Sequence, residues 1–182
     1  IQNDDYPILS FNYEKAFGAT NNDYHYDLIS ASVDYNKTIG NKGDFGLRFK
    51  AGKFFNAENI SFIDYKHFNG NQTHVNLLNN SLNSFNLLPY YSHSTNDAYF
   101  ETHIEHNFKG YIMNKIPLLN KLQWNLIGGF HQINIPDRKP YQEVTVGFDN
   151  IGWGKLRFLR IDYVRSYQNG FQGDGIMFGV KF

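Results

Sequence analysis

The chain has 182 residues with 17 basic and 17 acidic side chains, so no net charge favours nucleic acid or an acidic partner. It contains no cysteine, which excludes disulfides and thiolate metal sites. Aromatic residues make up 18% of the chain, yet no apolar run approaches the roughly 20 residues that a transmembrane helix requires.

Apolar and polar residues alternate from one end of the chain to the other, which predicts strands rather than helices. In chain order, the predicted strands cover residues 7–17, 24–38, 44–53, 59–68, 98–108, 122–133, 141–151, 155–167 and 173–182. Most of the connections carry Gly, Asn, Asp or Pro, the residues that supply turn geometry. The longest connection is the Asn- and Ser-rich stretch 69–97. The chain is therefore expected to be all-β, with antiparallel strands.

The length of the predicted strands favours a membrane barrel over a soluble β domain. Globular strands usually run about 5–6 residues, whereas a tilted strand that crosses a bilayer needs about 9–11. A soluble barrel or sandwich, with its apolar face inward, is the alternative. In a membrane barrel the apolar face meets lipid and the lumen holds mixed charge.

This interpretation assigns the two faces of the strands. The predicted lipid-facing residues are Phe100, Ile104, Val144, Val146, Phe148, Leu159, Ile161 and Tyr163. The predicted lumenal polar network comprises Glu101, His103, Glu105, Arg160 and Asp162.

Nine strands are an odd number, whereas bacterial single-chain barrels use even numbers. We therefore expect residues 1–182 to form the C-terminal portion of a larger barrel of 16 strands. The absence of an initiator Met or a leader at residue 1 also leads us to expect a processed or excised piece. Counting back from a periplasmic C-terminus places 38–42, 69–97, 134–140 and 168–173 outside the cell, with 69–97 as a loop that folds into the lumen. The same count places 17–23, 55–58, 110–120 and 151–154 in the periplasm.

Two groups of residues carry side chains that could support chemistry. Glu101, His103 and Glu105 share one face of a strand and could bind a metal or move protons, but ordinary lumenal polarity is the preferred interpretation. By residue type, His74, Ser92, His93, Ser94 and Asp97 are the candidates for a hydrolase at the barrel rim. No nucleophile motif organises them, and we expect no enzyme activity, metal or cofactor.

Three stretches carry a resemblance to known proteins: "LLPYYSHSTNDAYFETHIEHNFKGYIMNKIPLLNKLQ", "LRFLRIDYVRSY" and "GIMFGVKF". Together they resemble a Bacteroidota outer-membrane family of unassigned function, in which a carboxypeptidase-like regulatory domain precedes a barrel. This C-terminal section in turn is similar to the surface-antigen superfamily that includes BamA and TamA. The Val-Arg-Gly-aromatic loop motif of that superfamily is not present in 69–97, so the resemblance does not imply an insertase mechanism built on it.

The resemblance implies a location in the bacterial outer membrane and a role in outer-membrane protein biogenesis or protein transport, as a subunit of a larger complex. The implied partners are outer-membrane lipid, lipopolysaccharide and the barrel assembly machinery. The terminal alternation of Ile176, Phe178, Val180 and Phe182 resembles the β-signal that this machinery recognises. The alternatives are a passive porin, a TonB-type solute transporter and a rim-site hydrolase.

Overall fold

The computed structural model describes residues 6–17, 20, 24–71, 73–77 and 82–180, and these form an all-β structure. The strands are β1 (Ile8–Ala16), β2 (Tyr26–Thr38), β3 (Asp44–Phe55), β4 (Val75–Leu77), β5 (Tyr99–Asn107), β6 (Asn125–Asn134), β7 (Tyr141–Trp153), β8 (Leu156–Tyr167) and β9 (Phe171–Val180). One short α-helix, α1 (Gly110–Met113), follows β5. Short 3-10 turns span Gly40–Lys42, Phe62–Asp64 and Leu119–Leu122. Among the described residues, no helix is long and apolar enough to cross a membrane.

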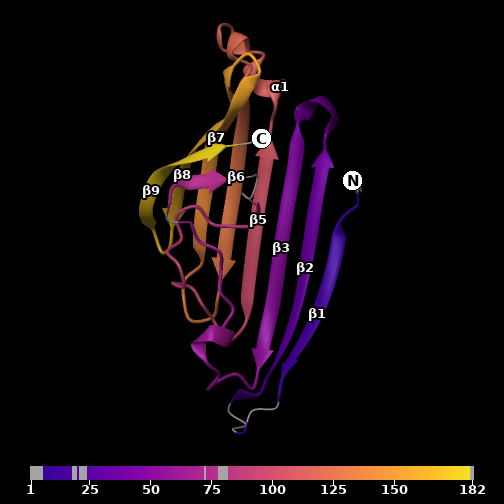
Figure 1. The fold of residues 1–182 in the computed structure, drawn as a ribbon, viewed down its shortest axis with the longest axis vertical. Coiled ribbons are helices and arrows are strands. Elements are labelled where there is room, and N and C mark those ends of the chain that lie inside the picture. The colour runs from indigo at the N-terminus through magenta and orange to yellow at the C-terminus, as the bar shows by residue number, and fades with distance from the viewer. Residues whose placement is uncertain (1–5, 18–19, 21–23, 72, 78–81, 181–182) are drawn as a thin grey trace.

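The strands form a single sheet in the order β1-β2-β3-β5-β6-β7-β8-β9-β4 (Figure 1). The eight long strands pair antiparallel with their neighbours, so the sheet is a meander. Only β4 is parallel, and it pairs with β9 over three residues. The sheet is not closed, since no described strand lies along the outer edge of β1. The prediction of antiparallel all-β structure is confirmed.

The predicted strand at 59–68 is wrong. This stretch contains the 3-10 turn Phe62–Asp64 and a single isolated bridge between Lys66 and Thr95. Its apolar residues Ile60 and Phe68 are buried in the core instead of alternating across a sheet. The strand that brings the total to nine is the short β4, inside a stretch that was predicted to be a loop. The predicted strand 122–133 also starts too early, because Leu122 lies in a 3-10 turn before β6.

Because 59–68 is not a strand, the connections are distributed over the two ends of the sheet differently from the prediction. The connections 39–43, 108–124 and 154–155 lie at one end, here called the α1 end, at the top of Figure 1. At the opposite end, here called the rim, β1 is followed by β2 and β3 by the connection 56–98, and the connections 135–140 and 168–170 lie there as well. The grouping of 38–42 with 69–97 is therefore wrong, as is that of 17–23 with 110–120. Both errors arise from counting 59–68 as a crossing.

The described part of the connection 56–98 folds back over one face of the sheet, here called the covered face. The ring of Phe85 lies 4.7 Å from that of His103 on β5, and β4 pairs with β9. These contacts join opposite parts of the sheet through one connection, and Figure 1 shows the sheet curling around it. At the rim, the connection and the sheet enclose an apolar core of Tyr26, Phe54, Ala57, Ile60, Phe68, Phe85, Leu88, Tyr99, Ile133, Ile135 and Tyr141.

The other face of the sheet, here called the open face, is apolar and uncovered. On β7, Val146 is 50% exposed, whereas its neighbours Thr145 and Gly147 are buried. Two residues further along the covered face, Glu143 is fully buried at 0% exposure. The same inversion continues on β8, where Ile161 is exposed and Asp162 is buried. The sheet therefore exposes apolar side chains and buries charged ones, which is the reverse of a water-soluble sheet.

Gly147 of β7 provides a test of the close packing on the covered face. A Cβ added there would clash with the Asp162 carboxylate and would lie 2.7 Å from the backbone oxygen of Ile161. We expect Gly147→Ala to lower the free energy of unfolding by about 1–3 kcal/mol, the usual cost of overpacking. A lower guanidinium midpoint, followed by circular dichroism, would show it.

Gly173→Ala is the matched control, because a Cβ at Gly173 of β9 has no atom within 4 Å. Equal midpoints for the two variants would contradict the packing that the structure describes.

Candidate functional site

The covered face gathers buried charged and polar side chains from four adjacent strands. They come from alternate positions, because successive side chains of a strand point to opposite faces. The buried polar residues on these strands are Glu101, His103, His131, Glu143, Thr145, Asp149, Asp162 and Ser166. Since a buried polar group is costly unless it is paired, the contacts among these residues decide what the site can do.

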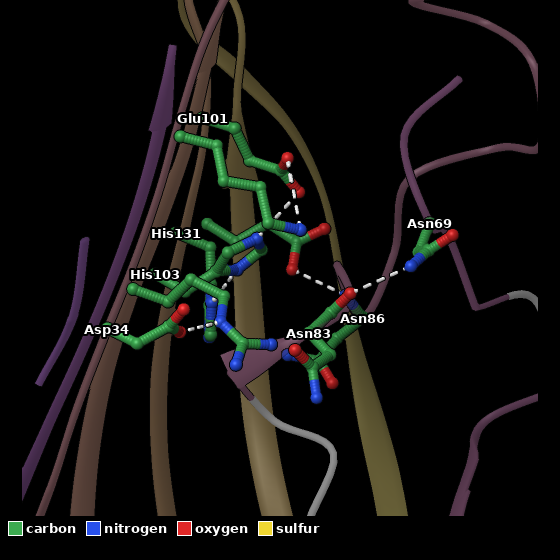
Figure 2. Close-up of polar contacts among 10 residues, drawn as sticks. Asp34, Asn69, Asn83, Asn86, Glu101, His103 and His131 are labelled. Carbon is green, nitrogen blue, oxygen red and sulfur yellow. Dashed lines mark hydrogen bonds and ion pairs between the residues drawn. The ribbon is translucent and has the colours of Figure 1, made fainter. Parts of the chain in front are cut away.

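Glu101, His103 and His131 form a hydrogen-bonded chain (Figure 2). Nε2 of His103 lies 3.0 Å from Oε1 of Glu101, and Nδ1 of His103 lies 2.8 Å from Nδ1 of His131. A carboxylate can only accept, so His103 donates to Glu101; a neutral His103 then accepts the Nδ1–H of His131. The second oxygen of Glu101 lies 4.0 Å from the Lys50 ammonium.

Arg160 organises a second cluster further along the same face. Its guanidinium lies 2.7 Å from Oε2 of Glu105 and 2.6 Å from Oδ2 of Asp162. Glu105 is on β5 and Arg160 on β8, so this ion pair reaches across β6 and β7. On the two strands between them, Gly129 is in register with Glu105 and Gly147 with Asp162. Arg160 thereby ties four strands together on the covered face.

These two clusters account for the five residues predicted as the lumenal polar network. The structure places all five on the covered face, but it divides them. Glu101 pairs with His103, which in turn contacts His131. Glu105 and Asp162 both pair with Arg160. Glu101, His103 and Glu105 therefore do not converge on one point. Among the described residues, no three metal-ligating side chains gather in a group that could hold a metal.

Glu143 holds the connection against the sheet. Its two carboxylate oxygens accept hydrogen bonds from the backbone N–H groups of Asn86 at 2.7 Å and Leu87 at 2.8 Å. The hydroxyl of Tyr141 donates to the same carboxylate at 2.8 Å. Beside this clamp, the ring of Phe85 packs on His103 and Tyr141. The connection thus covers the hydrogen-bonded chain of Glu101, His103 and His131, and it also supplies hydrogen-bond donors to Glu143 of β7.

Sequence reasoning missed His131, Glu143 and Phe85 as members of this site. Alternation placed Glu143 on the polar face of its strand but could not indicate its partners. The register brings His131 directly opposite His103, and register cannot be read from either strand alone. No signal in the stretch 69–97 distinguished Phe85 from its neighbours.

The residues predicted as candidates for a hydrolase do not converge. Ser94 pairs with His67 at 2.6 Å, and Ser92 Oγ lies 2.9 Å from Nδ1 of His93. The Ser92 hydroxyl donates to the Pro89 carbonyl, and Gln168 donates to Nε2 of His93. These bonds leave the Nδ1–H of His93 donating to Ser92, so His93 is not placed to take its proton.

The two remaining candidates, Asp97 and His74, have other partners. The backbone N–H of Asp97 donates to Oγ1 of Thr95, and the His74 carbonyl accepts from the N–H of Phe178. His93 itself borders a cavity of about 390 Å³ that Arg138, Gln168 and Gln172 also line. Burial lowers the pKa of His93, and the charge of Arg138 lowers it further. This arrangement favours a neutral imidazole with a packing role.

The residues predicted to face lipid all lie on the open face. Among them, Phe100, Val144, Val146, Leu159, Ile161 and Tyr163 are exposed, and Ile104 and Phe148 are partly buried. Of the predicted C-terminal signal, Ile176 and Phe178 are exposed and Val180 is partly buried. Phe182 lies outside the described residues. The contact of these side chains with lipid remains a prediction.

The clamp on the connection can be tested with Glu143→Gln. The amide would offer a single acceptor oxygen to three donors, and hydrogen bonds to a charged group contribute about 1.5–3 kcal/mol. We expect hydrogen exchange at the amides of Asn86 and Leu87 to become roughly 10- to 100-fold faster. Mass spectrometry of peptides covering 83–88 would measure it.

Glu105→Gln is the matched control. It removes a carboxylate from the same face, but its partner is Arg160 rather than the connection. Unchanged exchange at 83–88 in Glu143→Gln, or equal acceleration in both variants, would contradict the clamp.

Comparison with known proteins gives one family. The sequence model described as "Family of unknown function (DUF5686) C-terminal domain" matches residues 1–148, a range that ends within β7. No curated protein and no solved structure matches the chain. Because the match covers well over half of the 182 residues, the chain belongs to the DUF5686 C-terminal domain family.

Proposed function

We propose that this chain forms part of the wall of a transmembrane β-barrel in a bacterial outer membrane. The observation that carries the proposal is the reversed sheet, with an uncovered apolar face and a buried charged face. Exposed apolar area costs roughly 25 cal/mol per Å² in water but nothing in lipid. A lumen, in contrast, accommodates carboxylates, imidazoles and guanidinium groups as long as they are paired.

The dimensions of the strands support this proposal. The strands β2 and β7 have 13 residues, and β6 and β9 have 10. A tilted strand needs about 9–11 residues to cross the hydrocarbon core. The first described strand, β1, has no described partner on its outer edge, and an open edge is not tolerated in lipid. We therefore propose that further strands of the protein complete the barrel, to a total of 16.

We propose that the connection 56–98 occupies the lumen and that the rim faces the cell exterior. The termini of the sheet support this orientation, since β1 starts and β9 finishes at the α1 end, which would then be periplasmic. A lumen filled by Phe85, Leu88 and their neighbours would not act as a passive pore. The hydrogen bonds of Ser92 and His93 likewise speak against a rim hydrolase, and we propose a non-enzymatic role.

The resemblance to the surface-antigen superfamily suggests what that role is. We propose that the protein acts in outer-membrane protein biogenesis or protein transport, as a subunit of a larger complex. Its own insertion would use the barrel assembly machinery, with Ile176, Phe178, Val180 and Phe182 as the recognised alternation. A TonB-type transporter is the second candidate, because a connection that fills the lumen also fits a gated channel.

Val146→Arg tests whether the open face meets lipid. An arginine near the middle of a membrane strand costs about 2–4 kcal/mol. We expect the variant to lower the stability of the folded protein in phospholipid vesicles by that amount. Guanidinium titration, read from the heat-modifiable migration of folded protein on gels, would measure it.

Ile63→Arg is the matched control, because Ile63 is 80% exposed but lies in the connection rather than on the open face. If the open face met water, both variants would be near neutral. A neutral Val146→Arg would therefore refute the membrane barrel.

Measurements of ion conductance distinguish a barrel whose lumen is filled from an open porin. We expect the full-length protein to be electrically silent in planar bilayers, and removal of residues 69–91 to give steady single-channel currents. Correct folding of the deletion variant would be checked by heat-modifiable migration. Stable conductance from the intact protein would instead assign it to the porins.

Depletion in cells tests the proposed role in biogenesis. We expect loss of the protein to lower the amounts of several unrelated outer-membrane barrels, measured by quantitative proteomics of purified outer membranes. Loss of uptake of a single nutrient, with an unchanged outer-membrane proteome, would favour the transporter instead.

A further inference from the structure

The α1 end carries a surface in which basic and apolar side chains are mixed. It joins the connection 108–124 to the hairpin of β7 and β8, which Figure 1 shows next to it. Arg157 of the hairpin donates to the carbonyl of Leu122 at 2.7 Å, and Asn150 donates to the carbonyl of Gln123 at 2.7 Å. Here the name basic end patch denotes six exposed basic and apolar residues of these two segments, namely Lys115, Leu118, Lys121, Trp153, Lys155 and Leu156.

The apolar side chains of the patch are largely exposed. Trp153 is 91% exposed, and Leu118 and Leu156 are exposed as well. Trp153 lies at the tip of a hairpin whose polar contacts fix its position. Exposed tryptophan and leucine beside lysine are typical of segments that lie at the headgroup level of a bilayer.

Charge differs sharply between the two ends of the sheet. The connections 39–43, 108–124 and 154–155 contain Lys42, Lys109, Lys115, Lys121 and Lys155 but no Asp or Glu. The described residues of the rim connections include Glu58, Asp64, Asp97 and Asp137 against Lys66, Arg138 and Lys139. The α1 end is thus the basic end of the molecule.

Within the described part of the chain, most of these lysines have no carboxylate partner. Among the described residues, only Lys109 of these lysines has a carboxylate partner, Asp44 at 2.8 Å. Lys115 lies over the ring of Tyr111 at 3.8 Å, a contact that leaves its charge in place. Lys121 and Lys155 are exposed and make no ion pair with any described carboxylate.

We propose that the basic end patch binds the headgroups of anionic phospholipids, with Lys121 and Lys155 on the phosphates and Trp153 and Leu156 between the acyl chains. The inference rests on the proposed function, because it requires the sheet to lie in a bilayer. Each lysine near an anionic surface adds an attraction that corresponds to about a 5-fold preference. The patch gives the barrel a preferred lipid on its α1 side.

The two tryptophans of the described chain, Trp124 and Trp153, both lie at the α1 end, so fluorescence reports on this patch. The full-length protein is reconstituted in phosphatidylcholine vesicles with either brominated phosphatidylcholine or brominated phosphatidylglycerol. The part of the signal due to Trp153 is obtained by subtracting that of Trp153→Phe. We expect the anionic lipid to quench it with at least about 5-fold higher apparent affinity.

A double variant, Lys121→Gln with Lys155→Gln, should reduce this preference to near unity while heat-modifiable migration stays unchanged. Arg138→Gln with Lys139→Gln is the matched control, since it removes two positive charges from the rim, and it should keep the preference. Equal quenching by the two lipids in the inserted protein would overturn the proposal. That result, together with Lys121-dependent binding of an acidic protein, would assign the patch to a protein partner. Absence of quenching by both lipids would instead refute the membrane barrel itself.

Discussion

The covered face of the sheet places carboxylates and imidazoles out of contact with bulk water, and the rest of the structure depends on how they are paired. Removing the partner of a buried charge is far more costly than losing a surface contact. Glu143 finds three donors, two of them backbone N–H groups of the connection. Arg160 finds Glu105 across two intervening strands. The sheet therefore holds the connection in place, and the connection donates hydrogen bonds to a buried carboxylate of the sheet.

This mutual requirement also explains the curl of the sheet. A flat sheet would hold β5 and β8 too far apart for Glu105 and Arg160 to meet. Gly147 has no side chain, and the Asp162 carboxylate occupies the place that a Cβ there would take. The uncovered apolar face is then convex, which is the shape that a barrel wall presents to lipid.

The two ends of the sheet differ in chemistry as well as in structure. The rim carries the apolar core, the pairs of Ser92 with His93 and of Ser94 with His67, and most of the acidic loop residues. The α1 end carries short turns, the 108–124 segment and four lysines that form no ion pair with a described carboxylate. Such an asymmetry suits a molecule whose two ends meet different surroundings, and it is independent of what fills the lumen.

The sequence alone determined that the chain is all-β and which side chains share a face of a strand. It also located the ends of seven of the eight long strands to within a few residues. A strand period of two is a local property, so the common face of Glu101, His103 and Glu105 could be predicted. The start of β6 could not, because Leu122 and Trp124 continue an apolar pattern through a turn. The stretch 59–68 resembles a strand because Ile60 and Phe68 are apolar, but these residues pack in the core at the rim and do not belong to a sheet. Only the tertiary structure decided that Glu101 and Glu105 belong to separate clusters, that His131 faces His103, and that Glu143 holds Asn86 and Leu87. These pairings depend on strand register and on the path of a long connection, and neither is encoded in the spacing of residues within one strand.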